Sequence, residues 1–423
     1  MPSKSKYFNR VSDEILAKQL KASGAVLIEG PKWCGKTSTG INAAKSILFL
    51  QDPDKKDLYM QTVKTLPSRL LVGDVPRMID EWQEAPTLWD AVRFEVDKRG
   101  KRGQFILTGS SVPRDDESIS HTGTGRISRI KMRPMSLYES KESTGEVSLK
   151  SLFDGNLDIE GESKLTIPQL AEIICRGGWP DAVVNGDENY LVSKNYTDAV
   201  ISLDVSRVRG VAPNPERVRK LLRSYARNIS TLAAISTIQG DVSQNEGNLQ
   251  STALYDYINA LKRIFLIEDV PAWQPSLRSK TAIRSGEKRQ FVDPSIATAV
   301  MNADPDKVLD DLNYMGFLFE SLCTRDIRVY SEPLAGYVKY YRDRNGLEAD
   351  IIIELADGRW APIEVKLGSA DIDSGAQNLI RLRNKVNSEK MGQPSFMMVL
   401  TGTPYAYKRE DGVLVVPLGC LKP

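Results

Sequence analysis

Hydrophobic and polar positions follow two different periods along the first part of the chain. Short apolar runs such as "GAVLIEG" and "GQFILTGS" read as buried strands, whereas "KTSTGINAAKSIL" has helical spacing. Strands that alternate with helices predict a parallel sheet flanked by helices. We therefore expect a first α/β domain over residues 1–140.

The pattern changes three more times. Residues 140–165 are polar and contain Gly and Ser, which is typical of an exposed connection, and helical patterns follow, so we expect a linker and helical lid over 141–214. Three helices and a short strand over 215–275 have the order of a winged helix. Strands return over 276–423, with helices between them, and predict a second, smaller α/β domain.

Composition narrows the class of protein. A length of 423 residues suggests about three domains. The formal net charge of +2 neither demands nor excludes nucleic acid. The four cysteines are scattered without a C-x-x-C pair, which argues against a disulfide framework or a zinc ribbon, and His121 is the single histidine. No apolar stretch has the length of a membrane span, so we expect a cytoplasmic protein.

The stretch "GPKWCGKT" matches G-x-x-x-x-G-K-[ST] between a predicted strand and a predicted helix. Gly30 and Gly35 let the backbone curl so that its N–H groups face a phosphate. Lys36 reaches the β- and γ-phosphates, and the Thr37 hydroxyl ligates Mg²⁺. A chance glycine turn would not need every fixed position, so we expect ATP or GTP to bind here. The other expected nucleotide contacts are Pro31, Lys32, Trp33, Cys34 and Ser38.

Hydrolysis needs further groups beside the phosphates. In "RMIDEWQEAP", Asp80 can hold Mg²⁺ and Glu81 can orient or deprotonate the attacking water. The strand "FILTGSS" ends in Thr108, Gly109 and Ser110, where a polar side chain could sense the γ-phosphate. Arg126 or Arg129 could neutralise charge in the transition state, although a surface salt bridge is the alternative for either.

Taken together, "GPKWCGKT", "IDEWQ", "FILTGSS", "GRISRIKMRPMSLYE" and "RGGWPDAV" resemble the bacterial and archaeal AAA-type ATPases that carry a C-terminal DUF4143 domain. The resemblance implies an AAA+-like P-loop ATPase, and no N-K-x-D guanine signature supports a GTPase. A departure is Lys32, where many relatives have Arg. The resemblance assigns Lys36 and Thr37 to the first nucleotide motif, and Asp80 and Glu81 to the second. It makes Ser110 the phosphate sensor and Arg126 the candidate arginine finger.

The middle of the chain offers a candidate nucleic-acid surface. Arg219, Arg223 and Arg227 lie at four-residue steps on one helix, and Lys262 and Arg263 follow on a later one. These cations could contact phosphates, with DNA favoured over RNA. The alternative is a solvated face on a module that packs between domains, and the modest local basic excess favours it.

The stretch "ADIIIELADGRWAPIEVKLG" predicts a hairpin with charges on its strands. Glu364 and Lys366 share one face, because strand residues two apart point the same way. Such a hairpin resembles that of PD-(D/E)XK nucleases, in which Asp350 and Glu364 would hold Mg²⁺ and Lys366 would steady the attacking hydroxide. Glu320 on a preceding helix would add a third carboxylate to the metal site, and Gln377 follows on the next helix. The alternative is a solvated ion pair.

These observations give two hypotheses for the whole chain. In the first, a Mg²⁺-dependent ATPase couples its nucleotide state to a nuclease-like C-terminal domain that acts on nucleic acid. In the second, the chain is a regulatory ATP switch whose C-terminal domain is inert and binds a protein partner. Metal binding at Asp350 and Glu364 distinguishes the two, and a finger acting in trans from Arg126 would require an oligomer.

Overall fold

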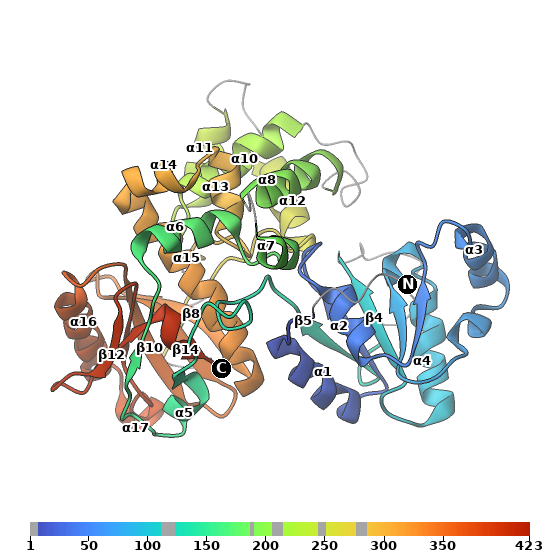
Figure 1. Ribbon diagram of the computed structural model, residues 1–423, viewed down its shortest axis with the longest axis horizontal. Helices are drawn as coiled ribbons and strands as arrows, with labels where there is room; N and C mark the ends of the chain where they lie inside the picture. The colour runs from blue at the N-terminus through green and yellow to red at the C-terminus, as the bar shows by residue number, and fades with distance from the viewer. Residues whose placement is uncertain (1–6, 111–122, 187–189, 205–214, 244–250, 276–285) are drawn as a thin grey trace. The chain divides into compact units, whose positions relative to one another are not determined.

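The computed structural model describes residues 7–110, 123–186, 190–204, 215–243, 251–275 and 286–423 (Figure 1). Its contacts divide the chain into two compact units. The first consists mainly of Met1–Pro134, and the second consists mainly of the residues from Met135 to the end.

The first unit is built on a five-stranded sheet in the order β2-β3-β4-β1-β5. All its neighbouring strands are parallel, as the alternating pattern predicts. The strands are β1 (Ala25–Glu29), β2 (Ser46–Phe49), β3 (Arg77–Asp80), β4 (Phe105–Gly109) and β5 (Ile127–Lys131). The helices are α1 (Val11–Ala22), α2 (Lys36–Ala43), α3 (Lys56–Thr65) and α4 (Leu88–Arg99).

Both faces of this sheet are buried. Leu27 and Leu107 pack into a cluster with Trp89 of α4. Their neighbours Val26 and Ile106 join a second cluster. Successive side chains of a strand point to opposite faces, so a continuous apolar run is what a doubly covered parallel sheet requires.

The second unit contains a seven-stranded sheet in the order β7-β12-β13-β11-β10-β9-β8. β8, β9 and β10 are antiparallel neighbours, whereas β10, β11 and β13 run parallel. Helix α16 (Ile372–Lys385) buries Ala376 and Leu379 against the sheet, and α15 (Leu312–Ser331) packs along β8, β9 and β10 (Figure 1). The strands are β7 (Gly161–Glu162), β8 (Gly336–Arg342), β9 (Glu348–Leu355), β10 (Trp360–Lys366), β11 (Met398–Thr401), β12 (Tyr405–Lys408) and β13 (Leu414–Pro417).

The segment expected to be an exposed connection is instead part of the second unit. β6 (Val147–Ser148) pairs with β14 (Leu421–Lys422), and β7 pairs with β12. Between them lies α5 (Leu149–Phe153), in which Leu152 is buried. A few apolar residues in a polar stretch are enough to anchor it once a distant part of the chain supplies the partner strands.

The middle region is helical, as predicted. In α10 the apolar residues Leu221, Leu222 and Tyr225 are buried. Arg219 and Arg227 lie on the other face, where they pair with aspartates at 2.8 and 3.3 Å. The helices are α6 (Ile167–Arg176), α7 (Pro180–Asn185), α8 (Tyr190–Ala199), α10 (Pro215–Arg227), α11 (Ile235–Ser243), α12 (Ser251–Arg263), α13 (Ser295–Met301) and α14 (Pro305–Asp310).

The winged helix stays a prediction. Helices α10, α11 and α12 are followed by an isolated bridge between Ile267 and Phe291, which fits the expected order. Residues 244–250, within the predicted region, lie outside the described residues.

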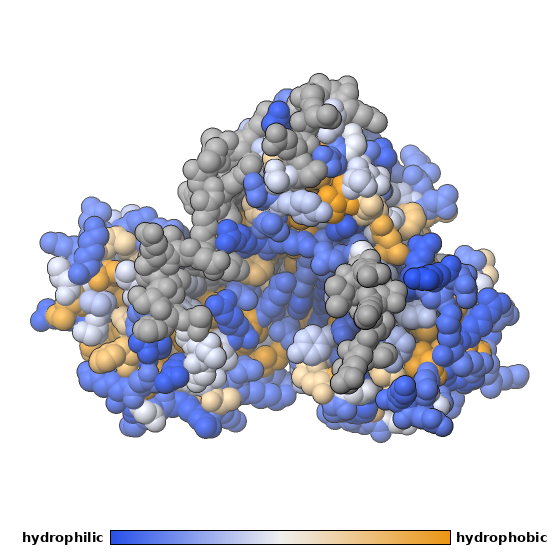
Figure 2. All heavy atoms as spheres, turned by 180° about the vertical axis from the view of Figure 1, so that it is seen from behind, coloured by the Kyte–Doolittle hydropathy of each residue, from blue (hydrophilic) through white to orange (hydrophobic). Residues whose placement is uncertain are grey.

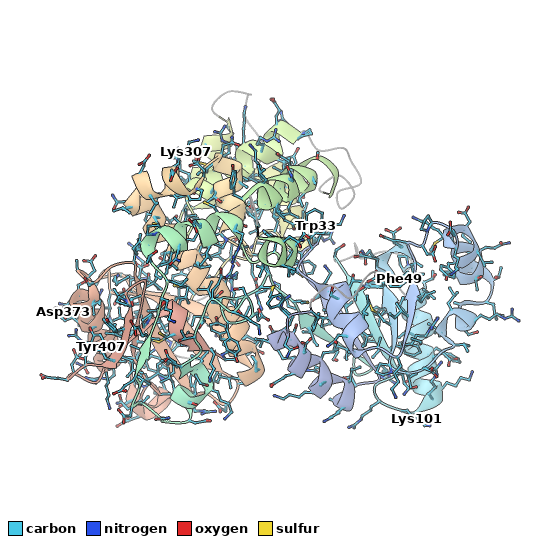
Figure 3. All side chains as sticks on the ribbon, in the orientation of Figure 1. Trp33, Phe49, Lys101, Lys307, Asp373 and Tyr407 are labelled. Carbon is cyan, nitrogen blue, oxygen red and sulfur yellow. The ribbon has the colours of Figure 1, made fainter. Side chains whose placement is uncertain are left out.

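Polar side chains dominate the face drawn in Figure 2, where apolar residues form smaller patches. Among the described residues, no helix is long and apolar enough to cross a membrane. Some large apolar side chains are nevertheless exposed, among them Trp33, Phe49 and Tyr407, which Figure 3 labels.

A buried charge network crosses the second unit. On α15, the Arg325 guanidinium pairs with Asp293 at 2.9 Å and with Asp326 at 2.7 Å. The two carboxylates also accept hydrogen bonds from backbone N–H groups: the Leu137 N–H donates to Asp326 (2.9 Å) and the Gly178 N–H donates to Asp293 (3.0 Å). Buried charges are tolerated when they are paired and hydrogen-bonded in this way.

Gly178 permits the close approach of two backbones. Its carbonyl accepts the Met135 N–H at 2.6 Å, and a Cβ on Gly178 would lie 2.1 Å from the Met135 carbonyl oxygen. We expect Gly178→Ala to destabilise the second unit by about 1–3 kcal/mol or more, as overpacking does. The matched control is Gly240→Ala in α11, where a Cβ meets nothing within 4 Å and Ala is the better helix former. Equal changes in melting temperature for the two variants would contradict this account.

Candidate functional site

The loop between β1 and α2 has the geometry that its glycines predict. Gly30 has φ 157°, and a Cβ there would lie 2.1 Å from the Met132 carbonyl oxygen. Gly35 has φ 104° and immediately precedes α2, which begins at Lys36. A side chain at either position would be strained or would collide, so the sequence needs glycine at both.

Side chains inside and outside the loop hold its shape. Lys36 is buried and its ammonium donates to the Pro31 carbonyl at 2.6 Å. The Arg10 guanidinium donates to the carbonyls of Cys34 (2.7 Å) and Arg133 (2.8 Å). Arg10 comes from just before α1, and no motif in the sequence marks it as part of the site.

Three other predicted nucleotide contacts lie nearer the surface. Trp33 has φ 64° and is 58% exposed (Figure 3). Ser38 is exposed, and Lys32 is partly buried. Contact of these side chains with a nucleotide stays a prediction.

The acidic strand end meets the loop as expected. Asp80 ends β3, and its Oδ1 accepts from the Thr37 hydroxyl at 2.9 Å. The same oxygen accepts from the hydroxyl of Thr108 on β4 at 2.7 Å. A hydroxyl and a carboxylate side by side are oxygen ligands of the kind that Mg²⁺ takes together with waters and substrate phosphates. The residues therefore fit a magnesium ion.

Glu81 is positioned by Thr108 and Ser110, which the sequence places at the site, and by Gln83, which was not predicted to belong to it. Its φ is 53°, and its N–H donates to the Thr108 hydroxyl at 3.0 Å. Its Oε2 accepts from the Ser110 hydroxyl at 3.1 Å and from the Gln83 amide. The predicted phosphate sensor Ser110 thus contacts Glu81 in this structure, and its sensing role stays a prediction. Thr108 and Gln83 lie within the stretches "FILTGSS" and "IDEWQ", where their polar side chains were the available signal.

Arg126 lies at the opposite end of the strands from the phosphate loop. Its carbonyl accepts from Ala25, the first residue of β1, whereas the phosphate loop follows the last. At about 3.3 Å per residue, a strand of this length separates the two ends by roughly 15 Å. The guanidinium donates to Asp97 at 2.9 Å. Arg126 therefore does not reach the nucleotide site of its own chain. Arg129 pairs with Glu29 at 3.2 Å.

The charged hairpin brings its predicted residues together. Ile351 pairs with Ile363 in the antiparallel register, which sets Asp350 opposite Glu364. The Asp350 carboxylate accepts from the Val365 N–H at 2.9 Å. Lys366 pairs with Glu364 at 2.9 Å. Gln377 is exposed.

A lysine lies among the carboxylates of Glu320, Asp350 and Glu364, which were expected to hold a metal ion, and their role as metal ligands stays a prediction. The ammonium of Lys288 lies 2.7 Å from Glu320 Oε1 and 3.4 Å from Asp350 Oδ1. The Lys288 side chain is 1% exposed. Within the described ranges, no group of three or more His, Cys, Asp or Glu side chains could hold a metal ion. The Lys288 ammonium thus occupies the space between Glu320 and Asp350 where a Mg²⁺ ion would have to bind.

Burial dominates the acid–base properties of this cluster. It raises the pKa of Glu320 to about 8 and that of Glu364 to about 8, with Asp350 adding to both shifts. Burial alone would lower the pKa of Lys288, but Glu320 and Asp350 outweigh it and the pKa is raised. Lys288 lies in "KRQFVD", and a lysine among strand residues was the signal in the sequence.

Three stretches of the chain match known protein families. Residues 22–141 match the AAA domain, residues 167–307 match a domain of unknown function named DUF8612, and residues 315–421 match another, DUF4143. No curated protein matches the sequence.

Solved structures offer distant likenesses. A Walker-type ATPase of Pyrococcus abyssi is 14% identical with a TM-score of 0.43, over 70% of this chain and 97% of the other. AMPPCP-bound DnaA from Aquifex aeolicus is 12% identical with a TM-score of 0.29, over 62% and 89%. A signal transduction ATPase with numerous domains, which has a tetratricopeptide repeat sensor and comes from Pyrococcus horikoshii, is 14% identical with a TM-score of 0.21, over 79% and 51%. The family matches carry the assignment: the chain has an AAA domain in its N-terminal part and a DUF4143 domain in its C-terminal part.

Proposed function

We propose that the first unit binds ATP with Mg²⁺ and hydrolyses it. The contact of Thr37 with Asp80 carries the proposal, because it sets two magnesium-type ligands beside the glycine-bounded loop that holds Lys36. The AAA domain supports it independently.

Each residue has a distinct role in this proposal. The loop N–H groups and Lys36 bind the phosphates, and Thr37 and Asp80 hold Mg²⁺, which neutralises phosphate charge when bound. Glu81 orients or deprotonates the attacking water. Its carboxylate is held by Ser110 and Gln83, so it does not swing freely before nucleotide binds.

We further propose that nucleotide state acts on the second unit through the chain itself. The Met132 carbonyl lies against the phosphate loop, where it accepts from the Cys34 thiol at 3.6 Å. A few residues later, the Leu137 N–H donates to Asp326 of α15 in the second unit. A movement of the loop is thus transmitted along a short, anchored segment.

The second unit fits a regulatory switch better than a nuclease. A metal-dependent nuclease needs a divalent cation, whereas the Lys288 ammonium already contacts two of the carboxylates that would bind it, Glu320 and Asp350. We propose that this unit serves as a regulatory element and does not cut nucleic acid. Mg²⁺-dependent cleavage of plasmid, single-stranded DNA or RNA, with or without ATP, would favour the nuclease instead.

The ATPase roles are separable by substitution. Lys36→Ala should abolish tight ATP binding, because it removes the cation that contacts the β- and γ-phosphates. Glu81→Gln should keep ATP binding and lower kcat by roughly 10²-fold or more, since it removes the general base. Binding is measured by titration calorimetry and turnover by phosphate release, with Glu84→Gln as the control. Turnover of Glu81→Gln at the wild-type rate would assign water activation to another group.

We propose that Arg126 acts on the nucleotide of a neighbouring subunit. In that case ATP turnover per chain should rise with protein concentration, and Arg126→Ala should flatten the rise. Arg102→Ala, an exposed arginine on the same unit, is the control. A rate per chain that stays constant over a wide dilution range would leave Arg126 with its bond to Asp97 alone.

The cluster predicts a pH dependence of stability. Because the folded-state pKa of Glu364 is about 8 against 4.5 unperturbed, the folded state holds this proton more tightly. The resulting stability is fully present below about pH 4.5 and is lost as pH rises through 8. Urea unfolding across this range should show a smaller decline with pH for Glu364→Gln than for wild type, whereas exposed Glu410→Gln should behave as wild type. Equal pH profiles for Glu364→Gln and wild type would contradict the raised pKa. The charged groups that face Glu364 are Asp350, Lys366 and Glu348, with Glu320 and Lys288 beyond them.

A further inference from the structure

We propose that Lys288 permanently takes the place of a divalent cation in the carboxylate cluster of Glu320, Glu348, Asp350 and Glu364. The second unit would then fold around an internal ammonium and have no use for a metal ion. This inference deepens the proposed function, because it closes the DUF4143 domain to metal-dependent chemistry.

The ammonium has the contacts of a resident ion. It lies 2.7 Å from Glu320 Oε1, 3.4 Å from Asp350 Oδ1 and 3.7 Å from Glu348 Oε1. It also donates to the Asp350 carbonyl at 3.4 Å. An ammonium has three donors and no acceptor, and the hydrogen bonds to Glu320 and to the carboxylate and carbonyl of Asp350 use all three. With 1% of its side chain exposed, Lys288 is a core residue.

The backbone fixes Lys288 in position. Its N–H and carbonyl form two hydrogen bonds of 2.9 Å with Val270. The next residue, Arg289, pairs with Asp269 at 3.0 Å, and the Gln290 N–H donates to the other oxygen of Asp269 at 3.1 Å. Because the backbone is bonded at Lys288 and at the two residues that follow it, and the side chain is buried, the ammonium is part of the folded core of the second unit.

The cation and the carboxylates come from different regions of the chain. Lys288 lies in the part that matches DUF8612, whereas Glu320, Asp350 and Glu364 lie in the part that matches DUF4143. The middle region thus supplies the charge that the carboxylates of the C-terminal domain require. The domain completes its own core only when both regions are present.

Charge balance explains why a metal would be excluded. Lys288 and Lys366 together bring the charge of one divalent cation to the four carboxylates. An added Mg²⁺ would have to sit about 2.1 Å from the same oxygens. It would then lie within a few ångströms of the ammonium, and like charges in a buried site repel strongly.

Binding of Mn²⁺, counted by electron paramagnetic resonance on the nucleotide-free full chain, tests the proposal. All variants carry Asp80→Asn, which removes the carboxylate ligand beside the phosphate loop. We expect no bound Mn²⁺ in this background. Adding Lys288→Met should create one Mn²⁺ site, and further adding Asp350→Asn should remove it. The proposal would be overturned if the chain with Lys288 intact bound Mn²⁺ and Asp350→Asn abolished that binding. It would also be overturned if the Lys288→Met variant folded but bound no Mn²⁺.

A second measurement covers the case in which Lys288→Met does not fold. Without the ammonium, the buried Glu320 carboxyl must either stay protonated or remain an uncompensated charge, and Glu320→Gln removes that cost. The double variant Lys288→Met/Glu320→Gln should therefore melt closer to the wild-type temperature than Lys288→Met does. A double variant as unstable as the single one would refute charge compensation. ATP hydrolysis, measured with Asp80 intact in the double variant, should remain at the wild-type rate, so failure here is distinct from failure of the ATPase proposal.

Discussion

The second unit depends on the requirement that a buried charge be compensated. Helix α15 carries Glu320 and Asp326 into the interior, and each carboxylate meets a buried cation, Lys288 for the first and Arg325 for the second. An isolated carboxylate in such a position would cost several kcal/mol. The two pairs therefore decide which distant segments must lie against this helix: the stretch around Lys288 and the backbone at Leu137, which donates to Asp326.

The first unit obeys a different constraint. In a parallel sheet the carboxyl ends of all strands lie on the same side. The loop after β1, Asp80 at the end of β3 and the polar end of β4 are therefore brought together by the topology of the sheet. The hydroxyl of Thr108 then joins the two acidic residues, since it donates to Asp80 and accepts from the Glu81 N–H. A ligand site on this side follows from the topology, and the hydroxyl fixes its geometry.

The two units differ in how they use carboxylates. Asp80 is held by neutral hydroxyls, which leaves its charge available to an added cation. Glu320 and Asp350 are held by an ammonium, which consumes that charge. The same residue types thus indicate a metal ligand in one unit and a structural ion pair in the other, and the nature of the donor beside them is what separates the two cases.

Local sequence was enough to predict the phosphate loop, because glycine conformations and a strand-to-helix turn are encoded within a few residues. The convergence of Asp350 with Glu364 followed from the period of a strand and the register of a hairpin. Whether Arg126 acts on its own chain or on a neighbour was left open by the sequence, because a motif does not tell at which end of the strands an arginine lies. Lys288 was missed because it meets Glu320 and Asp350 from 32 and 62 residues away. Periodicity tells which side of a helix or strand is buried, but only the tertiary structure decides which distant side chain covers that side. Here the covering side chain is Lys288, and it carries positive charge where a metal ion was expected.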